Sequence, residues 1–156
     1  MKIRLLSFAV ICAIVAFVRL QAEEAPNASN ASKAKEEHTE LAGHMEEMGK
    51  VFRRLGRQVG DASKNEDSLK LIATIREHAE AGLKLEPAKK AEVPAAQQAK
   101  FVADYQAKMK SFLGNIAKLE SAIKAGNNAE AEDMIKALKQ DQKEGHKEFK
   151  TDAKKS

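Results

Sequence analysis

Met45 and His146 are a pair of residues in this sequence whose side chains could together bind a metal. A methionine thioether and a histidine imidazole form an axial ligand pair for haem iron. Either residue alone is weak evidence, because methionine commonly fills gaps in helical cores. Both residues fall on apolar stripes of predicted helices, so we treat them as candidate metal ligands.

Residues 1–22 have the features of a signal peptide. Lys2 and Arg4 precede an apolar run from Leu5 to Val18, and the small residue Ala22 stands directly before acidic residues. The apolar run is too short to span a bilayer comfortably, whereas its length is typical of a cleaved export signal. We therefore expect cleavage after Ala22 and export to the periplasm, with no membrane attachment of the mature protein.

Cleavage would also change the composition that matters for function. Cys12 is the one cysteine, and its loss excludes disulfides, thiolate metal sites, cysteine nucleophiles and covalently attached haem. Loss of Lys2, Arg4 and Arg19 leaves 24 basic residues against 23 acidic ones, from 27 and 23 in the full chain. The basic pI therefore does not imply nucleic-acid binding.

Residues 23–36 carry no hydrophobic periodicity and predict a flexible mature N-terminus, whereas residues 37–156 predict one domain. The abundance of Ala, Lys, Glu and Leu favours an all-α fold. Apolar spacing predicts helices over about 33–59, 65–85, 95–125 and 129–153. Asn65 or Asp67 is expected to cap the second helix, Pro87 and Pro94 to bracket a loop, and Gly126 to end the third helix.

The candidate ligands occupy the first and the fourth of these helices. In the first, a three-four alternation of apolar or aromatic positions includes Met45: His38, Leu41, Met45, Met48, Phe52, Leu55 and Val59. In the fourth, six residues fall within an arc of about 80°, which predicts that His146 faces the core: Ala131, Ile135, Leu138, Gln142, His146 and Phe149.

Short connections between the helices predict an antiparallel up-down-up-down four-helix bundle. In that topology Met45 lies about 22 Å above the Gly60 end and His146 about 27 Å above Asn128, at ~1.5 Å per residue. The difference is less than one helical turn, so the two side chains can face each other across a flat ligand. Tyr105 and Met109 of the third helix reach the same level.

Several stretches of the sequence resemble the soluble periplasmic cytochrome b562 family, whose bundles have this topology. They are Glu40–Met48 with Met45 inside it, Ile75-Arg76, Ala103-Asp104-Tyr105, and Gly126–Phe149 with His146 inside it. The resemblance covers nearly all of the chain after Glu37. This chain departs from the family where Met109 replaces a phenylalanine, Gly145 a tyrosine, and Gln142 and Lys150 arginines.

The resemblance implies a non-enzymatic electron carrier with one non-covalent haem b, ligated by Met45 and His146. Six-coordinate iron has no open position, which favours electron transfer over oxygen chemistry. Lys150 would meet a propionate at the rim. A monomer and an unidentified redox protein partner are expected. The cofactor-binding residues implied are Leu41, Met48, Leu83, Tyr105, Met109, Gln142 and Phe149.

Two other classes of protein remain open at this stage. A copper binder could use a dispersed set of soft donors, namely Met45, Met48, Met109, His44 and His146. A haem-free helical adaptor or stress protein would use the bundle core only for stability and a charged face for a partner. The lysine-rich outer strip of the fourth helix suits such a face, and equally an acidic redox partner. A hydrolytic enzyme has the least support, because no catalytic motif is present.

Overall fold

The computed structural model describes residues 39–151, and all of its regular structure is helical. The segments are α2 (Glu40–Gln58), the 3-10 helix η1 (Ala62–Lys64), α3 (Asn65–Leu83), the 3-10 helix η2 (Ala88–Glu92), α4 (Ala95–Lys124) and α5 (Asn128–Phe149). No strand occurs in this range. The predicted signal peptide, the predicted flexible N-terminus and His38 lie outside the described residues.

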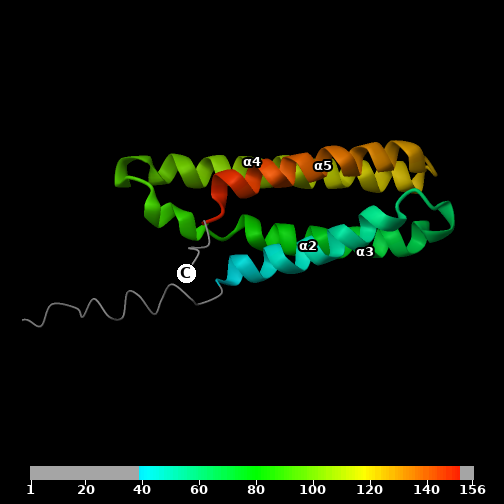
Figure 1. Ribbon diagram of the computed structural model, residues 1–156, viewed down its shortest axis with the longest axis horizontal. Coiled ribbons are helices and arrows are strands. Elements are labelled where there is room, and N and C mark those ends of the chain that lie inside the picture. Colours follow the sequence, from blue (N-terminus) through cyan, green and yellow to red (C-terminus); the bar gives the residue numbers. More distant parts are fainter. Residues whose placement is uncertain (1–38, 152–156) are drawn as a thin grey trace, which may run out of the picture. The chain divides into compact units, whose positions relative to one another are not determined.

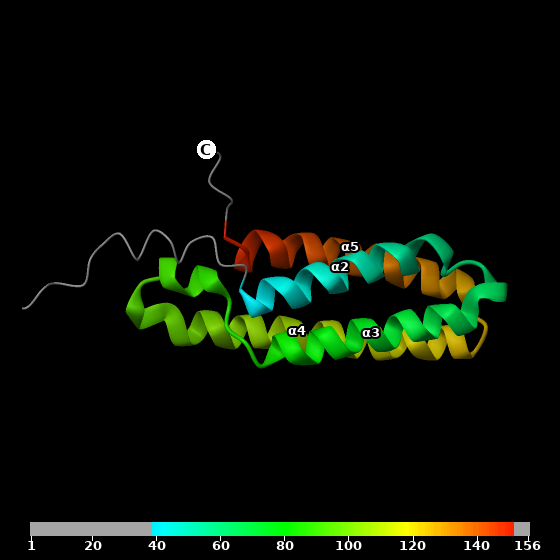
Figure 2. The same cartoon turned by 90° about the horizontal axis from the view of Figure 1, so that it is seen from below.

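The helices α2, α3, α4 and α5 run alternately up and down, as Figure 1 and the rotated view in Figure 2 show. Each packs along its neighbour in sequence, so α2 lies on α3, α3 on α4 and α4 on α5. The predicted all-α antiparallel four-helix bundle is confirmed. Within residues 39–151, no helix combines the length and apolar character that a membrane span requires.

The helix boundaries differ from the predicted ones where local hydrogen bonds compete with the hydrophobic pattern. Helix α2 begins at Glu40, because the Thr39 hydroxyl accepts a hydrogen bond from the Ala42 amide at 3.1 Å and caps the helix. Residues 33–38 of the predicted helix lie outside the described residues. Helix α5 ends at Phe149, four residues earlier than predicted, since Lys150 has extended backbone angles. Gly126 has the predicted positive φ, 76°, and ends α4.

The capping prediction for the second helix was wrong. Asn65 and Asp67 both lie inside α3. The capping side chain in this region is that of Asp61, which directly precedes η1 and accepts a hydrogen bond from the Ser63 amide. Asp67 instead accepts two hydrogen bonds from the Arg54 guanidinium of α2. Between Pro87 and Pro94 the predicted loop contains the one-turn helix η2.

The core runs the length of the bundle and is built from the apolar stripes of all four helices. Its fully buried large residues come from each helix in turn: Leu55, Ile72, Ile75, Ile116, Leu119, Ile123 and Leu138. The predicted inward positions of α2 are buried except Met45, which is half-buried. The hydrophobic pattern therefore identified most of the core.

A polar contact closes the end of the bundle where α2 joins η1 and α4 joins α5. The side-chain amides of Asn65 and Asn128 pair reciprocally, with one Nδ2 to Oδ1 distance of 2.7 Å and the other of 3.3 Å. The Asn128 Nδ2 also donates to the Val59 carbonyl at 2.7 Å, and the Asn65 Nδ2 to the Ile123 carbonyl at 3.3 Å. These bonds connect the ends or starts of all four helices.

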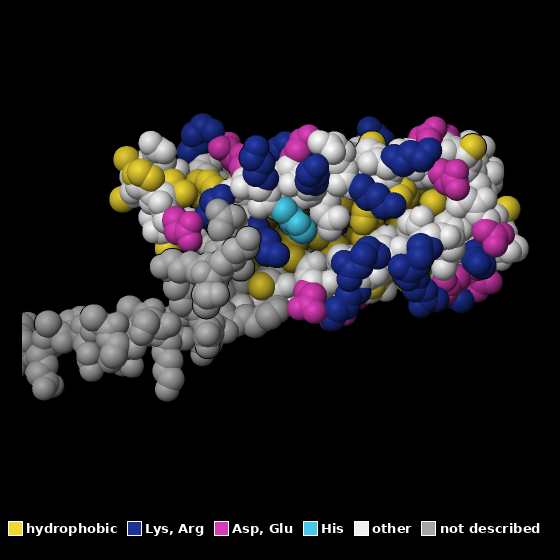
Figure 3. Space-filling view, viewed as in Figure 1, with side chains coloured by type: hydrophobic (Ala, Val, Ile, Leu, Met, Phe, Trp, Pro, Cys, Tyr) yellow, Lys and Arg dark blue, Asp and Glu magenta, His cyan; other side chains and the backbone are white. Residues whose placement is uncertain are grey.

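The fourth side of the bundle, between α2 and α5, is packed less closely than the three sequential pairs. Two glycines of α2 and one just after it lie on this seam, close to long polar side chains of α5: Gln142 near Gly49, Lys139 near Gly56 and Glu132 near Gly60. In Figure 3, hydrophobic side chains and a histidine ring are visible between α5 and α2. On the face that Figure 3 shows, hydrophobic side chains are thus exposed along the α2–α5 seam.

Candidate functional site

The contacts across the α2–α5 seam fix the relative register of the two candidate ligands. A Cβ built on Gly49 would lie 3.9 Å from the Gln142 amide nitrogen, and one on Gly56 would lie 3.3 Å from Ile135 Cγ2. Seven residues forward on α2 thus correspond to seven residues back on α5, as antiparallel helices require. Met45 is four residues before Gly49 and His146 four after Gln142, so Met45 and His146 lie at the same level.

Met45 is half-buried and lies between the seam and the core of the bundle. By helical geometry its direction is about 40° from that of Gly49, on the side of the buried α2 stripe. Its terminal methyl lies against α3, where a Cβ on Gly82 would be 3.0 Å away. The Leu41 Cδ1 and the Tyr105 hydroxyl approach the same point, at 3.3 Å and 3.5 Å. Gly82 therefore provides the space that the Met45 side chain occupies.

His146 does not face the core as predicted, because the residue is exposed. The buried stripe of α5 passes through Ala131, Leu138 and Phe149. His146 lies about 60° from the centre of this stripe, at its margin, by helical geometry. The same side of α5 carries the residues near the α2 glycines: Ile135, Lys139 and Gln142. His146 is thus on the side of α5 that faces α2, where the seam is too loosely packed to cover it.

The environment of His146 favours its neutral form. Partial burial of the imidazole lowers its pKa below the usual value, and the positive charge of Lys150, one turn further along, lowers that pKa in addition. Although the residue as a whole is exposed, its imidazole ring is therefore partly desolvated. A neutral imidazole has a free nitrogen lone pair, which is the form that binds metals.

Aromatic rings line the interior beside these two residues. The Tyr105 and Phe149 rings meet edge to face with centroids 5.6 Å apart, and Phe101 packs on Phe149 at 5.2 Å. Tyr105 is 4% exposed and its hydroxyl donates to the Gly82 carbonyl at 2.8 Å. Burial raises the pKa of Tyr105 to about 12. The tyrosine thus presents an apolar ring with a satisfied hydroxyl.

The remaining predicted cofactor-binding residues divide by burial. Leu41, Met48 and Met109 are buried, together with Tyr105 and Phe149, and belong to the core cluster. Leu83 and Gln142 are half-buried. The structure brings Leu41, Met45 and Tyr105 together around Gly82, and Phe149 joins them through Tyr105. Gln142 lies apart from this group, on the seam near Gly49.

Sequence reasoning missed three residues of this region. Phe101 is one turn before Tyr105, so its helical spacing was a signal that it shares the same face. Gly49 and Gly82 have no side chain, so side chains of neighbouring helices lie close to their backbone. Which side chains these are depends on how the helices pack. No pattern within one helix could reveal them.

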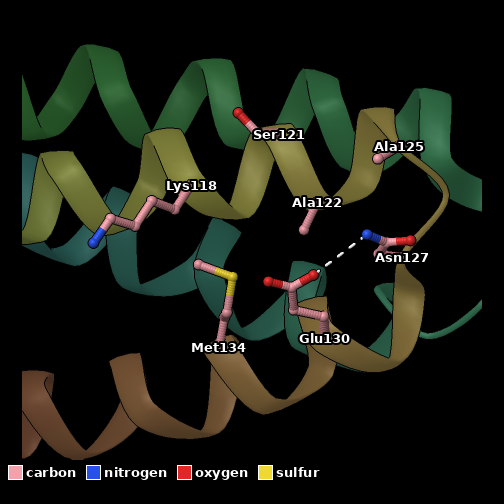
Figure 4. A pocket seen from close by; sticks show the side chains of 7 residues that line it. All are labelled: Lys118, Ser121, Ala122, Ala125, Asn127, Glu130 and Met134. Atoms are coloured by element: carbon pink, nitrogen blue, oxygen red, sulfur yellow. Dashed lines mark hydrogen bonds between the residues drawn. The ribbon is translucent and has the colours of Figure 1, made fainter.

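A shallow surface groove between α4 and α5 lies elsewhere. Figure 4 shows its lining, in which Asn127 donates a hydrogen bond to Glu130. The lining residues are Lys118, Ser121, Ala122, Ala125, Asn127, Glu130 and Met134. Met134 is about 18 Å from His146 along α5, at ~1.5 Å per residue. This groove is therefore separate from the Met45 and His146 region.

Comparison with known proteins identifies a family. The family model described as Cytochrome b562 matches residues 40–150, which include all four helices and both candidate ligands. No curated protein and no solved structure matches the chain.

Proposed function

The chain belongs to the cytochrome b562 family, and we propose that it is an exported electron carrier that binds one haem b between Met45 and His146. Family membership indicates a haem-binding electron-transfer protein of a non-enzymatic kind. The identity of the axial ligands, the residues around the haem and the periplasmic location are the finer parts of the proposal.

The observation that carries the proposal is the register of α2 and α5. Met45 and His146 lie at one level on facing sides of two helices, beside the seam that is least closely packed. A thioether and an imidazole on opposite sides of such a seam are suited to the two faces of one iron. Methionine and histidine together are an established axial pair for haem in electron-transfer proteins.

The chemistry of the surrounding residues also fits a haem. The lowered pKa of His146 keeps its nitrogen available to iron near neutral pH. A buried apolar wall is formed by Leu41, Met48, Tyr105 and Phe149. The Tyr105 hydroxyl is not left as an unpaired donor in this wall, because it donates a hydrogen bond to the Gly82 carbonyl. Together they would exclude water from a porphyrin, and hydrophobic burial would contribute much of its binding free energy.

When bound, the haem supplies a one-electron ferric/ferrous couple. The Met45 sulfur would favour the ferrous state, since soft thioether ligation raises the haem potential. Both axial positions would then be held by the protein, which suits electron transfer. Gln142 on the seam and Lys150 at the rim would meet the polar edge of the porphyrin, while Leu83 and Met109 would complete the apolar wall.

Export, partner and oligomeric state complete the proposal. The sequence of residues 1–22 supports a cleaved signal peptide and a periplasmic mature protein. The exposed lysines on the outer side of α5 would steer an acidic redox protein to the α5 face by long-range attraction. We propose a monomer, which does not bind nucleic acid.

Reduction potentials test this function. Met45→His would replace the thioether by a second imidazole, and we expect the potential of the haem-loaded protein to fall. The fall should be on the order of 100 mV or more, because axial ligands spread haem potentials over about 0.8 V. Met134→His, in the distant α4–α5 groove, is the matched control and should leave the potential unchanged. Equal potentials for wild type and Met45→His would contradict ligation by Met45.

A further inference from the structure

Two histidines meet on the outside of the bundle, between α2 and α3. The Nδ1 atoms of His44 and His78 are 3.0 Å apart, and the ring centroids are 5.3 Å apart with a 53° angle between the rings. Both residues are half-buried, and the side chain of His44 is 26% exposed. One ring therefore donates an N–H to the other across the helix interface, and the contact remains open to solvent on one side.

The positions of the two rings are fixed by well-packed helices. Helices α2 and α3 form the most extensively packed pair of the bundle. The Arg54 to Asp67 ion pair, at 3.0 Å, joins the same two helices further along. His44 is ten residues before Arg54 and His78 eleven after Asp67, so the histidine pair follows the same antiparallel register. The packing of α2 on α3 thus holds the two Nδ1 atoms near each other.

The geometry of the pair matches two ligands of one metal ion. A divalent zinc ion binds imidazole nitrogen at about 2.0–2.1 Å. An ion at that distance from both Nδ1 atoms would make an N–metal–N angle of about 90–100°, using the 3.0 Å separation. This angle is close to the square-planar value and moderately below the tetrahedral one. The two rings would turn so that both Nδ1 lone pairs point at the ion, which would replace the shared proton.

The second ring nitrogen of His44, which would not bind the ion, lies near a carboxylate. Its Nε2 lies 3.9 Å from a carboxylate oxygen of Glu40, one turn earlier on α2. Metal-bound histidines commonly direct their other ring N–H to a carboxylate, which orients the ring and strengthens the donor. At this distance a water molecule would bridge the His44 Nε2 and the exposed Glu40 carboxylate.

The pair is separate from the proposed haem ligands. Met45 follows His44 in sequence, but successive helical residues point about 100° apart. The Met45 methyl lies against Gly82, whereas His44 contacts His78 one turn earlier on α3. Among residues 39–151 no group of three His, Cys, Asp or Glu side chains is arranged to hold a metal, so water would supply the other ligands.

From these contacts we infer that His44 and His78 form a surface binding site for one Zn²⁺ or a similar borderline divalent ion, such as Cu²⁺ or Ni²⁺. Imidazole is a preferred ligand of all three ions. The ion would clamp α2 to α3 at the end of the bundle that carries Met45. This site requires neither haem nor His146.

Zinc titration of the full mature protein, free of any histidine tag, tests the inference. Isothermal titration calorimetry with ZnCl₂ should show one saturable ion per chain. His78→Ala should weaken that binding at least about tenfold, because it removes one of the two protein ligands. Asp141→Ala, which removes an exposed carboxylate of α5, is the control and should retain wild-type zinc affinity. Failure of wild type to bind zinc, or equal affinity in wild type and His78→Ala, would overturn the inference.

Thermal unfolding provides a second measurement that does not depend on the basal stability of each variant. For each protein the Tm is measured with EDTA and with zinc at about 100 times the dissociation constant. An ion that binds only the folded state should raise the wild-type Tm by about 5–10 °C. His44→Ala and His78→Ala should lose this increment, and the control Asp141→Ala should keep it. An increment that persists in both alanine variants would refute the site.

Discussion

Truncation of Asn128 to alanine should destabilise the bundle through contacts far from the proposed haem. The Asn128 amide donates to the Val59 carbonyl and to the Asn65 Oδ1, both at 2.7 Å, and it accepts from the Asn65 Nδ2 at 3.3 Å. Alanine removes all three hydrogen bonds. It also leaves the carbonyl of the buried Val59 and the Asn65 amide without these partners.

The magnitude follows from the two short bonds, because the 3.3 Å contact adds little. A hydrogen bond in a folded protein contributes about 0.5–1.5 kcal/mol net. Asn128→Ala should therefore lower the free energy of unfolding by about 1–3 kcal/mol. For a domain of this size, a loss of that order lowers the Tm by about 3–12 °C.

Urea unfolding followed by circular dichroism measures this change, and the neighbouring asparagine is the control. Asn127 is exposed, and its side chain makes one 3.4 Å hydrogen bond to Glu130. Asn127→Ala should cost less than about 0.5 kcal/mol, as is usual for surface changes. Asn65→Ala and the Asn65→Ala/Asn128→Ala double variant complete a cycle, in which the two losses should be less than additive. Equal stability of Asn127→Ala and Asn128→Ala, or full additivity with Asn65→Ala, would refute the reasoning.

Four further predictions concern two helix glycines, Tyr105 and Lys150. Gly114→Ala should stabilise the protein by about 1 kcal/mol, because its new methyl group meets no atom within 4 Å. Gly82→Ala should raise the free energy of unfolding in urea by less than Gly114→Ala does, since the Met45 side chain fills the space that the new methyl group needs. In a Met45→Ala background the stabilisation by Gly82→Ala should increase, and no increase would be inconsistent with this position of Met45. Burial raises the pKa of Tyr105 to about 12 from 10.0, so the unfolded chain ionises first and stability should fall between pH 10 and pH 12 by about 2–3 kcal/mol. Tyr105→Phe should remove this slope from denaturation curves, and an unchanged slope would argue against the buried hydroxyl. Lys150→Gln should raise the pKa of His146 in an NMR titration, whereas Lys147→Gln should not; an equal response to both would show that Lys150 has no special effect.

The bundle could be predicted from sequence because its signals lie within single helices. The alternation of Leu41, Met48, Phe52 and Leu55 identified one inward stripe, and all four residues are buried. Gly126 ended the third helix for a reason of backbone geometry that needs no tertiary context. The resemblance to cytochrome b562 was confirmed by the family match over residues 40–150.

Side-chain environments at the edges of the stripes could not be predicted in the same way. The predicted angular position of His146 on its helix agrees with the structure. Its exposure, however, depends on how closely α2 approaches α5, and no pattern within a single helix predicts that distance. Asn65 was expected to cap a helix but pairs with Asn128, which is 63 residues away in sequence. The His44 and His78 contact likewise depends on the register of two helices. Pairings between helices are therefore what the structure adds.

Haem titration followed by absorption spectroscopy is the most direct test of Met45 and His146 as axial ligands. Haemin is added to the mature protein, which is then reduced with dithionite, in parallel for wild type, Met45→Ala, His146→Ala and the control Met134→Ala. Wild type and Met134→Ala should bind one haem and show sharp low-spin Soret and α bands on reduction. Each of the other two variants should give a high-spin spectrum or bind haem weakly. Absence of a saturable haem spectrum in wild type, or a spectrum unaffected by both substitutions, would contradict the account.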